Sequence, residues 1–204
     1  MINSGLLAAI IFIIMYAFIA SEKINRTVVA MLGGLLMVFL GIITQETAIH
    51  HIDFSTLGLL IGMMIIVAIT GQTGIFNYIA IYAAQKAKGD PKIILIVLAL
   101  ITAVFSAFLD NVTTVLLIVP VTLSITKKLK VDPIPFLITQ IIASNIGGTA
   151  TLIGDPPNIM IGSAVKDLTF MAFIKNLVPI SILNLGVVIG ILSFIYRKQL
   201  NARA

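Results

Sequence analysis

Residues 144–164 read SNIGGTATLIGDPPNIMIGSA and interrupt a chain that is otherwise strongly apolar. The stretch places four glycines, two prolines, two asparagines and an aspartate inside a segment of lipid-like hydropathy. Backbone that leaves helical geometry in hydrocarbon exposes N–H and C=O groups, and each one costs several kcal/mol unless protein or water covers it. We therefore expect the break to form part of a binding site.

The composition predicts an all-α integral membrane protein. Of the 204 residues, 59% are hydrophobic and 10% are charged, whereas soluble domains carry about 25% charged residues. The absence of cysteine excludes disulfides and thiolate metal sites. The basic residues form short clusters between apolar runs without aromatic stacking platforms, so nucleic acid is not an expected partner.

Apolar runs of about 20 residues predict membrane-spanning helices. We expect spans over 2–20, 27–43, 54–71 and 177–196, and one more over 134–164 that is broken at 147–157. Residues 75–88 are short and end in lysines, which is typical of an interfacial helix on the membrane surface. Together these segments predict a single transmembrane domain over 1–204.

Residues 93–126 predict a re-entrant hairpin rather than a span. The polar sequence DNVTT separates two apolar arms, 93–109 and 115–125, and the second arm is too short to cross the bilayer comfortably. Lysines flank both outer ends of the segment. A hairpin keeps both lysine clusters on the same side of the membrane.

The positive-inside rule gives the expected orientation. With the N-terminus outside and the C-terminus inside, all of the 13 Lys and Arg residues except Lys166 and Lys175 fall on the inner side. Five crossings put the termini on opposite sides, as in one unit of an inverted-repeat transporter. A second copy of the hairpin and broken span does not occur in this sequence, so we expect half of a transporter that needs a second half or a homo-oligomer.

Two aspartates lie within the buried segments, Asp110 in LDNVTT and Asp155 in IGDPPN. Ionisable residues inside a membrane point to function. Each also precedes an expected helix, and Pro156 fits the first helical position, so each could simply cap that helix. In the functional interpretation, two helix N-termini with free N–H donors face one polar site.

Oxygen-bearing side chains and unwound carbonyls near these aspartates could hold a hard cation such as Na⁺. Glycines at the break permit positive φ and close approach to the hairpin tip. The candidate substrate- and ion-binding residues are Asp110, Asn111, Thr113, Thr114, Ser144, Asn145, Gly147, Gly148, Thr149, Thr151, Gly154, Asp155, Pro156, Pro157 and Asn158. The candidate sodium ligands among them are Asn111, Thr113, Asn145, Gly148 and Thr151.

The sequences DNVTTVLLIVPVT (110–122) and ASNIGGTATLIGDPPNIMIG (143–162) resemble the ion transporter superfamily. The resemblance is to the arsenical-pump and sodium–proton-antiporter permeases (the ArsB/NhaD type) and to the related citrate-transporter-like domain, and it covers one N-terminal repeat. It implies that the hairpin tip and the broken span bind Na⁺ and one side of the substrate. Asp155 stands where the sodium–dicarboxylate symporters of that superfamily carry threonine.

The resemblance predicts half of an ion-coupled secondary transporter that works by alternating access. The two aspartates oppose a polyanion, so they favour arsenite or sodium–proton exchange over a di- or tricarboxylate carried with sodium. Sodium or a proton is the expected coupling ion, and no other cofactor is expected. We place the chain in the plasma membrane of a prokaryote and expect no enzymatic activity. The alternative is a non-transporting or truncated membrane subunit that scaffolds a partner half.

Overall fold

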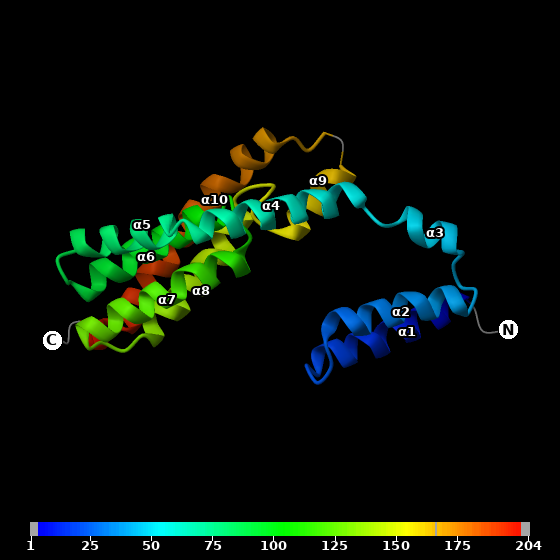
Figure 1. The fold of residues 1–204 in the computed structure, drawn as a ribbon, viewed down its shortest axis with the longest axis horizontal. Helices are drawn as coiled ribbons and strands as arrows, with labels where there is room; N and C mark the ends of the chain where they lie inside the picture. Colours follow the sequence, from blue (N-terminus) through cyan, green and yellow to red (C-terminus); the bar gives the residue numbers. More distant parts are fainter. Residues whose placement is uncertain (1–3, 166, 201–204) are drawn as a thin grey trace. The chain divides into compact units, whose positions relative to one another are not determined.

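The computed structural model describes residues 4–165 and 167–200, and within these ranges it is helical and contains no strand (Figure 1). The helices are α1 Ser4–Ala20, α2 Arg26–Phe39, α3 Gln45–His50, α4 Phe54–Gln72, α5 Ile75–Lys86, α6 Pro91–Ser106, α7 Asn111–Leu129, α8 Ile134–Thr149, α9 Pro156–Ala164, α10 Phe170–Ile195 and α11 Arg197–Leu200. The chain divides into two compact units, Met1–Phe54 and Ser55–Ala204.

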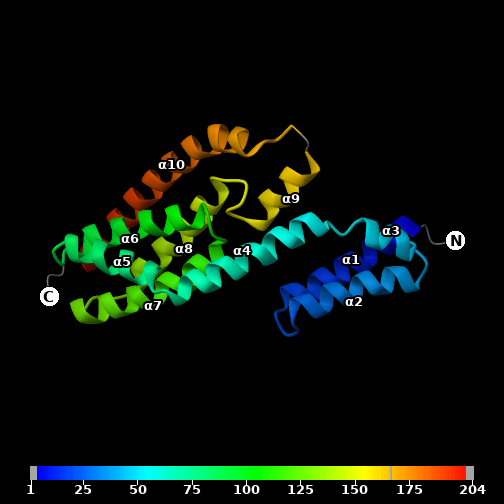
Figure 2. The ribbon, with the colours of Figure 1, turned by 45° about the horizontal axis from the view of Figure 1, so that its top comes forward.

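The first unit is built on the pair α1 and α2, which pack side by side (Figure 2). Gly33 permits this contact, because a Cβ there would lie 2.8 Å from Met15 Cγ. The helix α2 ends earlier than the predicted span over 27–43, and Gly41 follows it with a φ of 67°. The short helix α3 was not predicted; Thr44 begins it by accepting a hydrogen bond from Thr47 N at 3.2 Å.

The second unit is centred on α6. The contact between α6 and α8 is the most extensive between any two of the described helices. A cluster of fully buried apolar side chains lies at one end of this unit and includes Leu95, Leu98 and Phe136. A smaller cluster joins Ala99, Ala103 and Ala143, so α6 and α8 approach through small residues. This close approach of α6 to α8 positions the two polar interruptions of the chain.

The helices α6 and α7 form a helical hairpin, but its second arm is longer than the sequence predicted. The chain reverses after α6, where Leu109 N donates to Phe105 O at 2.8 Å. Helix α7 then runs over 19 residues instead of the expected arm over 115–125, because Asp110 caps its start and the polar residues on both sides of the apolar stretch continue the helix. That length is sufficient to cross a membrane, so the re-entrant character of the hairpin stays a prediction.

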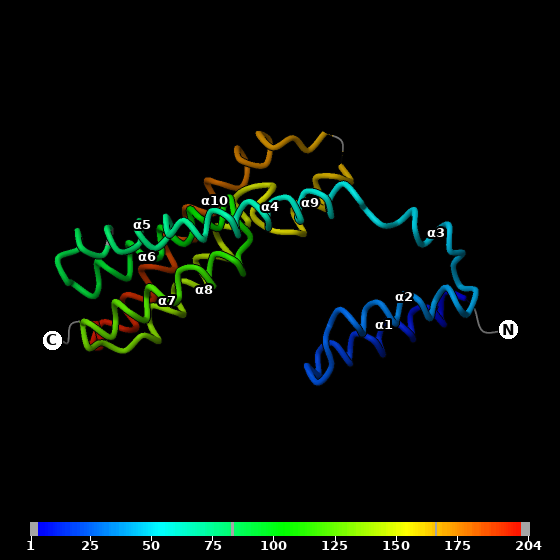
Figure 3. The backbone as a smooth tube through the Cα atoms, in the orientation of Figure 1, coloured from blue at the N-terminus to red at the C-terminus, as the bar shows by residue number. Residues whose placement is uncertain are grey.

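The predicted span over 134–164 is broken, and the break is shorter than predicted. Helix α8 continues through Gly147 and Gly148 to Thr149, and α9 already begins at Pro156. The connection between them appears in the backbone trace of Figure 3. Gly147, Gly148 and Gly154 do not use positive φ, contrary to the prediction.

Three helices of the described chain are long and apolar enough to cross a membrane, namely α4, α7 and α10. The helices α1, α2, α6 and α8 are apolar but shorter. Helix α10 is longer than the predicted span over 177–196 and keeps Pro179 inside it. Helix α5 falls within the predicted interfacial segment over 75–88. The number of crossings and the membrane-surface position of α5 remain predictions.

Basic residues gather at one end of the second unit. The residues Ala87, Leu129, Val131 and Leu200 pack in the same cluster, although they come from the end of α5, the end of α7 with the loop after it, and α11. The lysines beside them, and Arg197 with Lys198 in α11, therefore lie at that end (Figure 1). This clustering is what the positive-inside interpretation requires of these segments.

Candidate functional site

Asp110 lies at the N-cap of α7 and uses both carboxylate oxygens on its own helix. Its Oδ1 accepts a hydrogen bond from Thr113 N at 2.9 Å, and its Oδ2 accepts one from the Thr113 hydroxyl. The Asp110 carbonyl accepts from Thr114 N at 3.0 Å. The capping role of Asp110 is therefore confirmed. No described residue accepts from the N–H groups of Asn111 and Val112, so these are the open donors at this helix start.

Asp155 lies at the N-cap position of α9 but does not cap it through its side chain. Its backbone is extended, with φ −146° and ψ 138°, and the carboxylate accepts no hydrogen bond from the helix. The carboxylate lies instead over Gly148, where a Cβ would be 3.2 Å from Asp155 Oδ2. The sequence-based capping prediction is wrong for this side chain. Pro156 and Pro157 carry no N–H, and Asn158 N, at the position that Thr113 holds in α7, donates to Asp155 O instead of to the carboxylate.

The first turn of α9 therefore offers no free backbone donor. The N–H groups of Asn158 and Ile159 both donate to Asp155 O, at 3.0 and 3.3 Å. The prediction of two helix N-termini with free N–H groups is correct for α7 and wrong for α9. The Asp110 and Asp155 carboxylates are close enough to repel one another.

Asn111 and Asn145 connect the start of α7 to α8. The Asn111 side chain donates from Nδ2 to Asn145 Oδ1 at 2.9 Å, and Asn145 Nδ2 donates to Ile141 O at 2.9 Å. This arrangement leaves Asn111 Oδ1 as an acceptor. Asn145 is exposed and Asn111 is half-buried, so both amides can still contact a ligand.

The segment between α8 and α9 is held by side-chain hydrogen bonds. Thr151 donates its hydroxyl to Ala107 O in the hairpin turn and accepts from Gly154 N at 3.1 Å. Asn158 Nδ2 donates to Gly148 O at 3.2 Å and to Thr151 O at 2.9 Å. Two of the carbonyls that were predicted as ligands therefore already accept a hydrogen bond from Asn158. Each carbonyl oxygen has a second lone pair, which can still bind a ligand.

Gly147 and Gly154 provide the close approach that was predicted for them. A Cβ on Gly147 would overlap the carbonyl of Ala103 in α6, and a Cβ on Gly154 would lie 2.8 Å from Ser106 O and collide with Gly148 O. Both contacts are with backbone atoms, which cannot move aside as a flexible side chain can. The end of α6 and the break are therefore packed backbone against backbone.

The structure brings the predicted site residues together and separates them into two groups. One group is half-buried or exposed and can face a ligand: Asp110, Asn111, Thr113, Asn145, Thr149, Asp155, Pro156, Pro157 and Asn158. The other group is buried and supports the first: Thr114, Ser144, Gly147, Gly148, Thr151 and Gly154. Thr114 is fully buried, and its hydroxyl has no hydrogen-bond partner among the described residues.

The sequence-based prediction missed three polar residues that support this region. Ser106 donates to Ser144 O at 2.6 Å and joins α6 to α8. Gln140 donates to the Thr122 hydroxyl at 2.7 Å and joins α8 to α7. The available signal was a polar side chain inside an apolar run, since such residues in membrane helices face protein rather than lipid.

The chain is similar to known transporter proteins over most of its length. A family profile described as citrate transporter matches residues 16–204. An uncharacterised transporter of Mycobacterium tuberculosis is 45% identical over 192 residues, which cover 92% of this chain and 44% of that protein. The 46 kDa membrane protein of Mycobacterium leprae is 44% identical over 197 residues, covering 95% of this chain and 46% of the relative.

The human P protein is 49% identical over 153 residues, covering 72% of this chain and 18% of that protein. The chain spans less than half the length of each of these relatives. The region that the family profile matches, residues 16–204, includes both polar interruptions of the second unit.

Proposed function

This chain belongs to the citrate transporter family, and from that premise we propose that its second unit forms one half of the binding site of an ion-coupled secondary transporter. The site lies where the start of α7 meets the connection between α8 and α9. The proposal assigns substrate and ion contacts to the half-buried and exposed group of residues around Asp110, Asn111, Asn145 and Asp155, and adds the backbone carbonyls of the buried Gly148 and Thr151 as ion ligands. The proposed activity of the protein is transport rather than catalysis.

The observation that carries the proposal is the direct bonding between the two interruptions. Asn111 reaches Asn145 at 2.9 Å, and Thr151 reaches the carbonyl of Ala107 in the hairpin turn. These contacts join segments that are 34 and 44 residues apart in the chain. Discontinuous helices that meet in this way are the usual location of substrate and ion sites in secondary transporters.

A cation is the ligand that the local charge favours. Two carboxylates that repel one another gain when a positive charge lies between them or when one takes up a proton. Asp155 has a carboxylate that no described residue bonds and that lies over Gly148. The Asn111 and Asn145 amide oxygens and the Gly148 and Thr151 carbonyls belong to the hydrogen-bonded segments of the same region. We propose sodium or a proton as the coupling ion, with the sodium ligands drawn from this set and from Thr113.

The two carboxylates also bear on the transported substrate. A neutral solute such as arsenite, or exchange of sodium for protons, avoids bringing further negative charge to Asp110 and Asp155. The family description favours a second candidate, a di- or tricarboxylate carried with sodium. In that case the free N–H groups at the start of α7 would face a substrate carboxylate, and the cation would sit beside Asp155.

A complete site requires a second half. The chain covers 44% and 46% of its mycobacterial relatives, so we propose that the rest of a longer protein, a partner chain or a second copy supplies the remaining contacts. Alternating access would then move the α6–α7 hairpin and the break against a scaffold. The N-terminus is proposed to lie outside and the C-terminus inside a prokaryotic plasma membrane, with the basic end of the second unit at the inner surface.

The test is an ion-dependent thermal shift on the protein isolated from its own membranes. We expect Na⁺, but not K⁺ at equal ionic strength, to raise the unfolding midpoint, since a ligand that binds the folded state stabilises it. The variant Asn111→Ala should lose the shift. Asn176→Ala should keep it, because Asn176 on α10 bonds only the carbonyl of Ala172 among the described residues.

Uptake into proteoliposomes then separates the substrates. Arsenite, citrate and sodium-driven proton movement are measured on the same preparation, with Asp155→Ala as the impaired variant. The mass of the protein in native membranes shows whether this sequence occurs within a chain of about twice its size. An ion-insensitive protein that moves none of these solutes would instead be the non-transporting subunit that scaffolds a partner half.

A further inference from the structure

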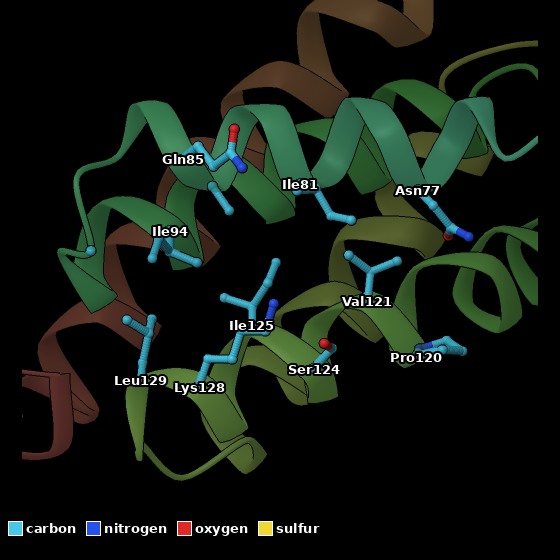
Figure 4. Close-up of a pocket in the computed structure, with 12 residues that line it drawn as sticks. Asn77, Ile81, Gln85, Ile94, Pro120, Val121, Ser124, Ile125, Lys128 and Leu129 are labelled. Carbon is cyan, nitrogen blue, oxygen red and sulfur yellow. The ribbon is translucent and has the colours of Figure 1, made fainter.

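A groove of about 520 Å³ lies between α5 and α7, away from the proposed transport site. Figure 4 shows Ile81 of α5 facing Val121 and Ile125 of α7 across it. Polar side chains occur along its length, with Asn77 at one end and Gln85 and Lys128 toward the other. These side chains are exposed, so the groove opens onto the surface of the second unit.

Helix α5 presents three different faces around this groove. Ala80 and Ala84 are buried in the core, as is Ala87 directly after the helix. Tyr78 and Tyr82 are exposed and stack on one another, with ring centroids 6.1 Å apart, and Lys86 lies 5.1 Å from the Tyr82 ring. Exposed tyrosine beside lysine is typical of the headgroup layer of a membrane. The third face lines the groove.

The end of the groove that Lys128 lines is strongly positive. Lys86, Lys88, Lys92, Lys127 and Lys130 lie on the segments around it, and no described residue forms an ion pair with any of them. The two aspartates in these segments cap helix starts and keep their charge, but the lysines there outnumber them six to two. Asp90 accepts from Lys92 N at 2.8 Å and Asp132 accepts from Ile134 N at 3.0 Å.

We propose that this groove binds one anionic phospholipid. The apolar wall takes an acyl chain, while Lys128, with Ser124 and Gln85 beside it, binds the phosphate and the glycerol region. None of the described residues hydrogen-bonds the side chains of these three, so they are available to a ligand. A small soluble anion would use the lysines but leave the apolar wall bare, and a neutral lipid would use the wall but leave the charge unmatched. Basic pockets between membrane helices recognise lipid headgroups by this combination.

The test compares phosphatidylglycerol with phosphatidylcholine of identical acyl chains, added to the full chain in detergent. Native mass spectrometry counts bound lipid, and the unfolding midpoint follows binding. We expect phosphatidylglycerol to bind and to raise the midpoint, and phosphatidylcholine to do so much less. Because one lysine near an anionic headgroup contributes modestly, Lys128→Gln should raise the half-saturating concentration about fivefold.

Two further variants control the result. Lys175→Gln removes a positive charge from α10 outside the groove and should leave binding unchanged. Ser124→Phe fills the groove without changing its charge and should weaken binding as Lys128→Gln does. Equal binding of the two lipids, equal effects of Lys128→Gln and Lys175→Gln, or the same shift with inorganic phosphate alone would each overturn the proposal. Failure of any lipid to bind, as expected if protein covers the groove, would overturn it too.

Discussion

Asp110 and Asp155 both stand directly before a helix, yet the two helix starts are built differently. Asp110 bonds the backbone and the hydroxyl of Thr113, so its carboxylate belongs to α7. The Asp155 carboxylate bonds nothing in α9, whose first two residues are prolines. Within the part of the chain that the structure describes, the α7 start keeps two unbonded N–H groups, while the α9 start keeps an unbonded carboxylate and no unbonded N–H.

The difference assigns complementary chemistry to the two regions. The start of α7 is suited to negative or polar oxygen atoms, because its N–H groups and helix dipole are positive. The start of α9 is suited to a cation or a proton, because it adds a carboxylate that its own helix does not satisfy. In the proposed transporter, a coupling ion beside Asp155 and a substrate oxygen beside Asn111 would therefore occupy neighbouring positions.

Gly154→Ala should destabilise this arrangement more than the other substitutions. The new Cβ would meet the backbone carbonyls of Gly148 and Ser106, so we expect the free energy of unfolding to fall by about 1–3 kcal/mol or more. Denaturant unfolding of the purified protein measures the loss. Gly190→Ala is the matched control, because a Cβ there meets nothing within 4 Å. Equal effects of the two variants would refute the close packing of the break.

Asn158→Ala tests whether that side chain holds the break. It removes the hydrogen bonds to Gly148 O and Thr151 O, and we expect destabilisation of about 1–3 kcal/mol because acceptors are left unpaired. Asn176→Ala, which removes one exposed bond on α10, should cost much less. The comparison is made on unfolding midpoints in the same detergent. A loss as small as that of the control would mean that the break holds its shape without Asn158.

Replacing Asp110 and Asp155 one at a time tests whether the two carboxylates contribute differently to stability. Asp110→Ala removes an N-cap and should cost about 0.5–2 kcal/mol. Asp155→Ala removes no hydrogen bond to a described residue and relieves repulsion from Asp110, so stability should be unchanged or higher. Asp110→Ser, which can still cap, should recover most of the loss. Chemical denaturation in the absence of sodium checks all three, and a larger loss for Asp155→Ala would contradict the structure.

The bond between Asn111 and Asn145 gives the smallest expected effect. A double-mutant cycle with both alanine variants should yield a coupling of about 0.5–1.5 kcal/mol, which is typical of a neutral hydrogen bond. The pair Asn111 and Asn176 serves as the uncoupled reference, since Asn176 bonds Ala172 O on its own helix. A coupling close to zero would show that the amides do not join α7 to α8 in solution.

The membrane nature of the chain, its helical content and the position of both polar interruptions follow from the order of its amino acids alone. Prolines, glycines and intramembrane aspartates mark these features locally, since each changes the hydrogen bonding or the charge of its own segment. The sequence also shows that Pro156 and Pro157 lack N–H groups, which leaves Asn158 N as the donor for an Asp155 cap among the first three residues of α9. Only the structure shows that this donor bonds Asp155 O instead.

The contacts between distant segments could be identified only from the packing of the helices. The bonds from Thr151 to Ala107, from Asn111 to Asn145 and from Ser106 to Ser144 join residues 34 to 44 positions apart. In a soluble helix the apolar stripe indicates the packed face, whereas helices in lipid are apolar on all sides and the period carries little information. The contact faces are set by small residues and polar side chains that match across helices, and such matches become visible only once α6, α7 and α8 are packed together.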